Sequence, residues 1–303
     1  MSAWIIASLI LATVLLLVTP VASTWQLPGR LPAAVESGFS AAPLPVSQHI
    51  SPPPVSARNI FIMDRPSKSV LLAQNADQQI FPASTTKMMT ALVALDHFQL
   101  AETITVTQAY KIGQVVGFKP GESLTVEQLL YALLVQSGND AAEILAENFP
   151  GGRSAFVAAM NQKARDIHLT NTHFVNPTGV DEAGLYSTAA DLARLADVAL
   201  RQPTFAKIVA TENAVISTHV LTNVNQLLGK IPGVLGVKTG YTEGAGQALV
   251  TLVQRNDHPV ILAVLESKDR FADSAALIDW VYSNWRWENP AGQTGRTGDT
   301  SGQ

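Results

Sequence analysis

The segment Pro82-Ala-Ser-Thr-Thr-Lys-Met-Met-Thr90 combines a helix start with two reactive side chains. Ser84 and Thr85 are residue types that often cap helices, and apolar residues then recur at nearly helical intervals at Met88, Met89, Leu92, Leu95 and Phe98. If the helix opens at Ser84, the i to i+3 spacing places Ser84 and Lys87 on one face, with Cβ atoms roughly 5 to 6 Å apart. The apolar stripe predicts a buried helix with Ser84 at its mouth.

Lys87 is a candidate proton acceptor for the Ser84 hydroxyl. A free serine is a poor nucleophile at neutral pH and needs a base within hydrogen-bond reach. A protonated lysine cannot serve, so Lys87 acts as a base only if burial or a nearby cation lowers its pKa. We expect Lys238 to be that cation.

Two further short motifs follow in the chain, Ser137-Gly-Asn139 and Lys238-Thr-Gly240. Each motif alone is a weak signal. Ser-x-x-Lys occurs about once by chance in a chain of ordinary composition, Ser-Gly-Asn is most often a turn, and Lys-Thr-Gly is a common strand end. Their order and flanking context together indicate a serine acyl-transfer site.

With these motifs, the chain resembles the low-molecular-mass penicillin-binding proteins of the serine D-Ala-D-Ala carboxypeptidase family. The similarity runs from about Arg58 to Trp287, and its most specific segments are Pro82–Thr90, Gln136–Ala142, Asn171–Gly179, Tyr186–Ala193 and Lys238–Gly246. The resemblance implies an α+β fold, an α/β sandwich of the β-lactamase/transpeptidase type. It would have a five-stranded antiparallel sheet flanked by helices and a second, all-helical lobe.

The hydrophobic pattern agrees with this fold. Strands are predicted near both ends of the domain, at 59–63, 69–73, 234–239, 247–253 and 260–265. Helices are predicted between them and over 270–285, including one that Thr125 and Gln128 start with a capping box and another after Thr188. The terminal strands must therefore meet in one sheet, with ligands in the cleft between the sheet and the helical lobe.

The resemblance implies a catalytic role for three side chains. Ser84 attacks the carbonyl between two D-alanines, Lys87 takes its proton, and Ser137 relays a proton to the departing D-alanine. The backbone N–H groups of Ser84 and Tyr241 would form the oxyanion hole.

The resemblance also implies a set of substrate-binding residues. Asn139 would hold the substrate amide and Lys87, while Lys238 and Thr239 receive the terminal carboxylate. Gly240 would leave room for the substrate beside its strand. Arg270 is either a further carboxylate ligand or an arginine at a surface helix start.

The implied activity is removal of the terminal D-alanine from peptidoglycan stem peptides ending in D-Ala-D-Ala, through an acyl-enzyme on Ser84. β-Lactams would be covalent inhibitors. Two alternatives stay open, a DD-endopeptidase that cuts D-Ala cross-links and a non-catalytic sensor of muropeptides or β-lactams. Glu182-Ala-Gly-Leu-Tyr186 comes close to the Glu-x-x-Leu-Asn of class A β-lactamases but ends in Tyr186. We therefore interpret Glu182 as a solvated loop residue and expect the penicilloyl-enzyme to be long-lived.

The two ends of the chain differ from the middle. Residues 1–23 are predicted to be a signal peptide or an N-terminal membrane anchor, because Trp4–Val18 is apolar and no charge precedes Arg30. Residues 24–57 form a Pro/Ala/Ser-rich linker and residues 288–303 a disordered tail, which leaves 58–287 as the penicillin-binding domain. The protein is expected to be exported to the periplasm or the outer face of the cytoplasmic membrane, attached through residues 1–23 if they are not cleaved.

Composition excludes several other classes of function. With 303 residues, 47% hydrophobic, the chain can bury a substantial core. Its net charge of -4 provides no basic surface for nucleic acid. The absence of cysteine excludes disulfides and thiolate metal sites, and the six histidines show no metal-ligand spacing. We therefore expect no metal and no other cofactor.

Overall fold

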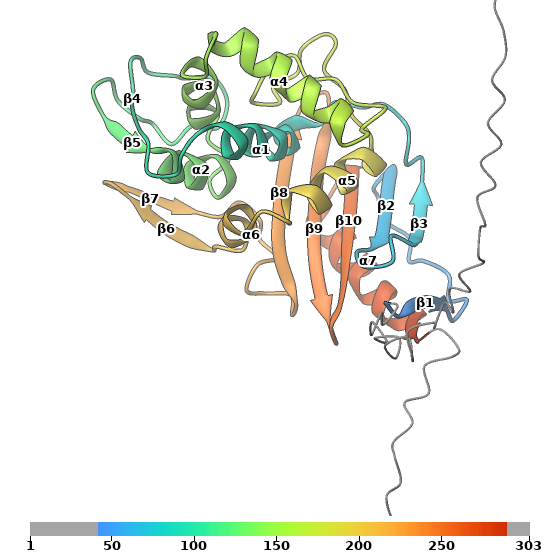
Figure 1. The fold of residues 1–303 in the computed structure, drawn as a ribbon. Helices are drawn as coiled ribbons and strands as arrows, with labels where there is room; N and C mark the ends of the chain where they lie inside the picture. The colour runs from blue at the N-terminus through green and yellow to red at the C-terminus, as the bar shows by residue number, and fades with distance from the viewer. Residues whose placement is uncertain (1–41, 290–303) are drawn as a thin grey trace, which may run out of the picture. The chain divides into compact units, whose positions relative to one another are not determined.

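The computed structural model describes residues 42–289. Its centre is a five-stranded antiparallel sheet in the order β3-β2-β10-β9-β8 (Figure 1), formed by β2 (Asn59–Asp64), β3 (Val70–Gln74), β8 (Val234–Thr242), β9 (Gly246–Arg255) and β10 (His258–Ser267). The strands from the two ends of the domain therefore meet in one sheet, as the sequence predicts. β8 lies at one edge of this sheet.

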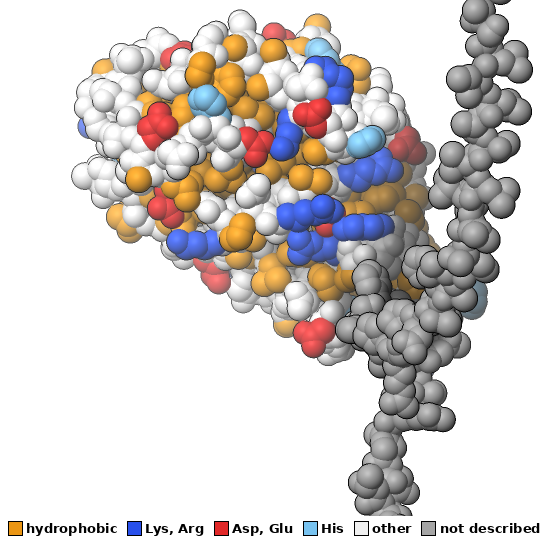
Figure 2. Space-filling model, in the orientation of Figure 1, with side chains coloured by type: hydrophobic (Ala, Val, Ile, Leu, Met, Phe, Trp, Pro, Cys, Tyr) orange, Lys and Arg blue, Asp and Glu red, His pale blue; other side chains and the backbone are white. Residues whose placement is uncertain are grey.

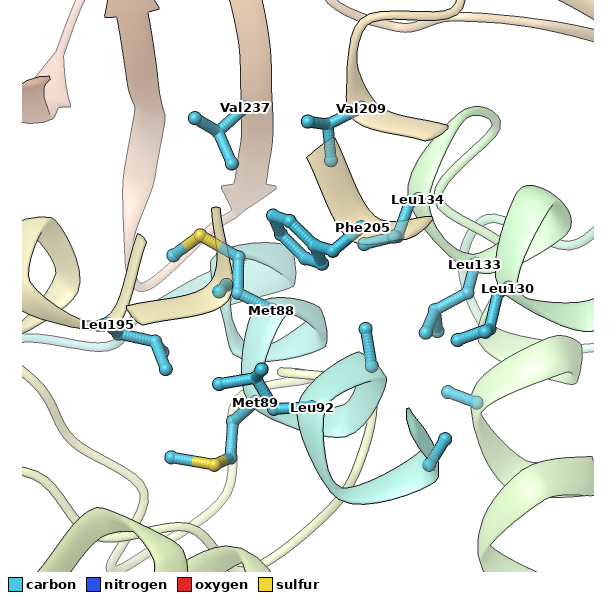
Figure 3. Packing of buried hydrophobic residues seen from close by; sticks show 14 of the residues in the cluster. Met88, Met89, Leu92, Leu130, Leu133, Leu134, Leu195, Phe205, Val209 and Val237 are labelled. Carbon is cyan, nitrogen blue, oxygen red and sulfur yellow. The ribbon is translucent and has the colours of Figure 1, made fainter. Parts of the chain in front are cut away.

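Helices cover both faces of the sheet, which explains why its central strands are apolar on both sides. Ile60 and Ile62 of β2 pack with Leu277 of α7 (Arg270–Asn284), whereas the alternate residues Phe61 and Met63 belong to the core on the other face. That second core joins the sheet to the helical lobe. Figure 3 shows part of it, with Met88, Met89 and Leu92 of α1 (Lys87–His97) among buried residues of other helices.

The helical lobe contains α1, α2 (Val126–Leu134), α3 (Asn139–Glu147) and α4 (Gly152–Asp166), followed by α5 (Ala189–Ala199) and α6 (Pro203–Val209). The predicted capping box is confirmed, because the Thr125 hydroxyl accepts from Gln128 N at 3.2 Å and the Gln128 amide oxygen accepts from Thr125 N at 2.9 Å. The Thr188 hydroxyl caps α5 in a similar way, accepting from Asp191 N.

The expectation of an all-helical lobe is wrong in one respect. Two small antiparallel ladders lie in this part of the chain, β4 (Thr103–Thr105) with β5 (Ser123–Thr125) and β6 (Asn213–Ile216) with β7 (His219–Thr222). Both are too short to show the apolar alternation from which a strand is predicted.

A salt-bridge cluster ties the β2–β3 turn to α5. The largely buried carboxylate of Asp197 accepts from Lys68 Nζ at 2.7 Å, Arg201 Nη2 at 2.9 Å and Arg65 Nε at 3.2 Å. Figure 2 shows Lys and Arg side chains gathered around one acidic group on this face. The shared carboxylate fixes how α5 lies over the sheet.

The start of α1 differs from the prediction. Ala83–Thr86 form a single 3₁₀ turn, η1, and the α-helix begins at Lys87. Neither Ser84 nor Thr85 caps the helix, because their hydroxyls are engaged elsewhere. The Thr85 hydroxyl donates to Pro82 O at 2.5 Å, and the Ser84 hydroxyl contacts Lys87 Nζ.

The last part of the predicted linker is folded against the domain. β1 (Leu44–Ser47) pairs antiparallel with β11 (Trp285–Glu288), so Glu288 is also part of a strand and not of a tail. Further along, Ile50 N donates to Asn284 Oδ1 at 2.7 Å and Ile50 O accepts from Trp280 Nε1 at 2.8 Å. The backbone of this segment finds its partners on α7 and β11, which composition alone does not reveal.

The remaining predictions for the chain ends lie outside the described residues. They concern residues 1–23, the linker up to residue 41 and the tail from residue 290. Within residues 42–289, every helix is too short or too polar to cross a membrane.

Candidate active site

Ser84 and Lys87 lie together at the start of α1, as the spacing predicts. Lys87 is fully buried, and its Nζ lies 2.9 Å from Ser84 Oγ, 2.6 Å from Asn139 Oδ1 and 2.7 Å from Thr178 O. Two of these oxygens can only accept, whereas the serine hydroxyl can also donate. A protonated amine can donate to all three oxygens, whereas a neutral amine can donate to Asn139 and Thr178 and accept from the Ser84 hydroxyl.

Burial is the main cause of the perturbed pKa of Lys87. It lowers the pKa of Lys87 to about 7, against the opposing effect of the Asp140 and Glu143 carboxylates. Of the two causes that the sequence analysis named, burial and a nearby cation, burial is therefore the dominant one. Repulsion between cations affects Lys238 instead. The pKa of Lys238 is held well below its usual value by burial, which is the largest cause, and then by the charges of Lys87 and Arg270.

Ser137 and Asn139 approach Lys87 and Lys238 from the helical lobe. Ser137 has a left-handed backbone (φ 64°), and its hydroxyl accepts from Lys238 Nζ at 2.9 Å. Asn139 begins α3, and its Nδ2 donates to Ile112 O at 2.8 Å. This bond orients the amide so that its oxygen faces Lys87.

Gly240 is required where β8 passes the serine. A Cβ at this position would lie 3.0 Å from Ala83 Cβ and 3.2 Å from Ser84 N. Gly179 is even more tightly placed, because its added Cβ would lie 1.8 Å from Ala83 O. Both glycines allow neighbouring segments to approach the η1 turn that carries Ser84.

A cavity of about 360 Å³ opens beside the serine. Arg270 lies half-buried at this cavity and donates from Nη1 to Gly240 O at 2.7 Å, so it is not a surface arginine. The cavity is lined by Ser84, Gly113, Gln114, Ser137, Val224, Thr239, Gly240, Tyr241 and Arg270. Every predicted site residue lies at this cavity or contacts a residue that lines it. Lys87 contacts Ser84, Asn139 contacts Gln114, and Lys238 contacts Ser137.

Sequence reasoning missed two contributors to the site. The carbonyl of Thr178 binds Lys87, but a backbone oxygen has no signature in the sequence. The buried carboxylate of Asp140 accepts from Val116 N at 2.9 Å, Gly117 N at 2.8 Å and Phe118 N at 3.4 Å. It fixes the loop that carries Gly113 and Gln114, and the adjacent Gln114 O accepts from Asn139 N at 2.7 Å.

This arrangement contains what serine acyl transfer requires: a nucleophile beside an amine with a lowered pKa, a second hydroxyl held by a second lysine, and a cavity with an arginine in its wall. In residues 42–289, no three side chains of the His, Cys, Asp or Glu type are grouped so as to hold a metal ion. The geometry defines the site as that of an active-serine enzyme.

The sequence profile of the peptidase S11 family, described as D-alanyl-D-alanine carboxypeptidase, matches residues 46–269. The chain belongs to this family, and it has the α/β sandwich of the β-lactamase/transpeptidase type that the sequence analysis predicts.

Known proteins support the family assignment. The D-alanyl-D-alanine carboxypeptidase DacF of Bacillus subtilis is 33% identical over 244 residues, which cover 76% of this chain and 63% of DacF. A D-alanyl-D-alanine endopeptidase of Pseudomonas aeruginosa is 31% identical over 265 residues, 83% of this chain and 85% of that protein. The crystal structure of the Streptomyces K15 DD-transpeptidase superposes with a TM-score of 0.74 at 30% identity, covering 77% of this chain and all of that one. The match thus spans less than two thirds of the length of DacF.

Proposed function

We propose that the protein is a serine D-Ala-D-Ala carboxypeptidase that removes the terminal D-alanine from peptidoglycan stem peptides. The observation that carries the proposal is the buried Lys87 amine at 2.9 Å from Ser84 Oγ, with N–H groups engaged by two acceptor oxygens. The family membership and the named activity of DacF support the choice of substrate.

In the first step, Ser84 Oγ attacks the carbonyl carbon of the penultimate D-alanine and its proton moves to Lys87 Nζ. The backbone N–H groups of Ser84 and Tyr241 stabilise the oxyanion, an interaction that typically contributes about 2.7 to 4 kcal/mol per donor. The C–N bond then breaks, and Ser137 relays a proton to the nitrogen of the departing D-alanine. Water hydrolyses the resulting ester and frees Ser84.

The terminal carboxylate of the substrate occupies the cationic end of the cavity. Lys238, Thr239 and Arg270 surround it, and Asn139 holds the substrate amide. A bound carboxylate would offset the cost of burying the Lys238 ammonium and raise the pKa of Lys238. Gly240 leaves the edge of β8 open to the peptide.

β-Lactams would acylate the same serine and remain bound. Glu182 is exposed and accepts from Asn176 Nδ2 at 3.0 Å, in keeping with a loop residue. We further propose that the protein is exported and acts in the periplasm or at the outer face of the cytoplasmic membrane. Attachment to that membrane through residues 1–23, if they are retained, belongs to the same proposal.

Labelling with a fluorescent penicillin tests the nucleophile. The purified protein is expected to be labelled covalently, and Ser84→Ala to abolish the label. Ser123→Ala, which changes an exposed serine on β5, is the matched control and is expected to keep it. Label that persists in the Ser84→Ala variant would refute the assignment of the nucleophile.

A DD-endopeptidase is the second candidate, because the Pseudomonas aeruginosa relative of that name matches over most of both chains. Incubation with a pentapeptide and with a cross-linked muropeptide separates the two activities. Free D-alanine from the pentapeptide supports the carboxypeptidase, and cleavage of the cross-link alone supports the endopeptidase. The absence of both products would favour a non-catalytic sensor of muropeptides or β-lactams.

A further inference from the structure

A cavity of about 290 Å³ lies where the turn between β2 and β3 meets α5, beside the salt-bridge cluster around Asp197. Its walls are formed by β2, the β2–β3 turn, the first residue of β3, the residue that follows α4, and α5. It shares no residue with the catalytic cavity, and the chemistry described above does not use it. The cavity therefore needs an explanation of its own.

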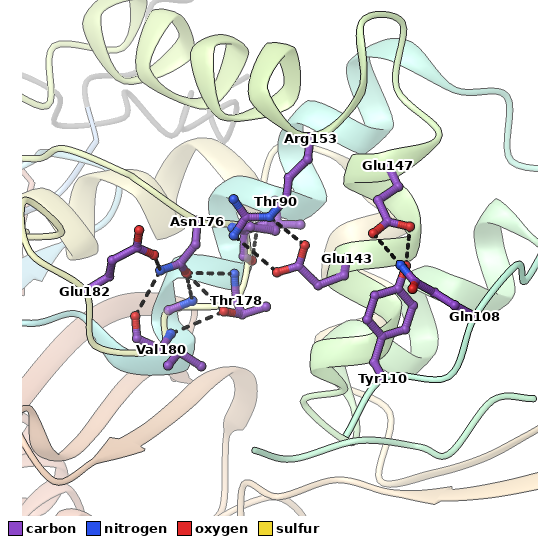
Figure 4. Close-up of polar contacts among 12 residues, drawn as sticks. Thr90, Gln108, Tyr110, Glu143, Glu147, Arg153, Asn176, Thr178, Val180 and Glu182 are labelled. Carbon is purple, nitrogen blue, oxygen red and sulfur yellow. Dashed lines mark hydrogen bonds and ion pairs between the residues drawn. The ribbon is translucent and has the colours of Figure 1, made fainter. Parts of the chain in front are cut away.

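The carboxylate of Asp197 does not balance the cations around it. It forms salt bridges with three of them, Arg65, Lys68 and Arg201, so one negative charge faces three positive charges. The salt bridge between α3 and α4, by contrast, pairs one cation with one carboxylate (Figure 4). The cluster around Asp197 thus has two positive charges in excess.

The excess charge is exposed, whereas the carboxylates are not. The side chain of Asp197 is 7% exposed, against 48% for Lys68 and 63% for Arg201. Arg194 adds a further exposed cation in the wall of the cavity, and the carboxylate of its partner Asp191 is fully buried. A ligand that enters from the face shown in Figure 2 therefore meets cations and not carboxylates.

These cations also keep hydrogen-bond donors for a ligand. Arg65 reaches Asp197 through Nε alone, Arg201 reaches it through Nη2 alone, and Arg194 reaches Asp191 through Nη1 alone. A guanidinium has five N–H donors, and within residues 42–289 the other nitrogens of these three arginines have no acceptor. Such groups bind phosphate oxygens through parallel hydrogen bonds.

Between the cations the cavity is apolar. Val70, on the edge strand β3, is 52% exposed, so an apolar surface is open to a ligand beside the cationic group. The volume is at the small end of the roughly 300 to 1,000 Å³ of ligand cavities, which suits one short carbon chain. The apolar lining consists of Phe61, Met63, Val70, Ile167 and Val198.

We propose that this cavity binds a phosphate monoester, with the phosphate at the exposed cations and the esterified carbon chain against the apolar lining. A phosphate monoester carries about 1.5 to 2 negative charges at pH 7, which matches the two excess positive charges, whereas a carboxylate carries only one. The site is a binding site, and it does not depend on the proposed peptidase activity.

A titration of the ¹⁵N-labelled full chain with hexyl phosphate, followed by NMR, gives both the position and the affinity. The amide signals of Lys68, Val70 and Arg194 are expected to shift together. Hexyl phosphate should bind about tenfold more tightly than inorganic phosphate, because burial of two methylene groups suffices for that gain. Heptanoate, which has one negative charge, should bind about threefold more weakly than hexyl phosphate or worse.

Dihexanoylphosphatidic acid distinguishes the two sources of such a group. Binding tighter than that of hexyl phosphate would support the site and identify a membrane lipid as the source. Binding weaker than that of hexyl phosphate would support a soluble phosphate ester, in keeping with the small volume of the cavity.

Two variants test the cations separately. Lys68→Gln and Arg201→Gln should each weaken the binding of hexyl phosphate by about two- to fivefold. Lys207→Gln, which removes an exposed lysine paired with Glu127 outside this cavity, is the matched control and should leave the affinity unchanged. Shifts confined to the catalytic cavity, heptanoate that binds as tightly as hexyl phosphate, or an affinity that neither variant lowers would overturn the proposal.

Discussion

The pH dependence of acylation tests whether the buried Lys87 amine is the base. With a pKa of about 7, the neutral amine makes up about 9% of the enzyme at pH 6 and about 91% at pH 8. The second-order rate constant for acylation by penicillin is therefore expected to rise about tenfold between these two pH values. The rise should level off above pH 8, because nearly all Lys87 is then neutral.

The Glu143 carboxylate offers a way to shift this profile without touching the reacting atoms. Glu143 favours the protonated form of Lys87, so Glu143→Gln should lower the pKa of Lys87 further and move the midpoint of the profile to lower pH. Removing Glu143 also leaves Arg153 without its partner, and this cation acts in the same direction.

Stopped-flow acylation with a fluorescent penicillin, from pH 5 to pH 9.5, measures the profile in both proteins. Circular dichroism over the same range excludes acid unfolding as the cause of the loss. A rate that stays flat down to pH 5, or a midpoint near the ordinary lysine value of about 10.4, would refute the assignment of Lys87 as the base. A Glu143→Gln midpoint above that of wild type would contradict the electrostatic argument.

Two further substitutions test other parts of the site. Lys87→Met should abolish labelling. The folded-state pKa of Lys87 lies below the unfolded one, so the cost of burying its charge is full below pH 7 and gone above about pH 10.5. The stability of the variant relative to wild type should therefore rise as the pH falls from 10.5 to 7, and urea melts in which the variant gains most at high pH would reject this. Asp140→Asn weakens the carboxylate that holds residues 116–118, and it should lower the free energy of unfolding by about 1.5 to 3 kcal/mol and raise KM for the peptide. An Asp140→Asn protein with wild-type stability and KM would show that the loop needs no such anchor.

Local signals in the sequence predict the fold well where the interaction is itself local. The capping box at Thr125 and Gln128 needs only residues three positions apart, and the strands β9 and β10 are apolar enough to identify alone. α4 has a weaker signal, because its buried residues, Phe156, Met160 and Ala164, form only a narrow stripe along a helix of 15 residues. β1 was assigned to a linker because its partner, β11, lies more than 200 residues away.

The sequence predicts those parts of the candidate site that are formed by side chains. Ser84, Lys87 and Lys238 are found from motifs, because their chemistry depends on residue type. The Thr178 carbonyl and the loop around Gly113 are found only in the structure, because they contribute backbone atoms and shape. The sequence names burial and a nearby cation as possible causes of a low Lys87 pKa, but only the structure shows that burial dominates, since burial is a property of packing.

The pairing of β1 with β11 sets how the domain responds to mechanical force. Leu44 pairs with Glu288 and Ser47 with Trp285, so the chain enters β1 and leaves β11 at the same end of this short ladder. A pull on the chain before Leu44 opens the pairs in sequence, as in a zipper, and each pair resists alone. β2, the next strand along the chain, is paired on both sides, with β3 and with β10. A load applied at Leu44 therefore has to separate β1 from β11 before it reaches the catalytic sheet.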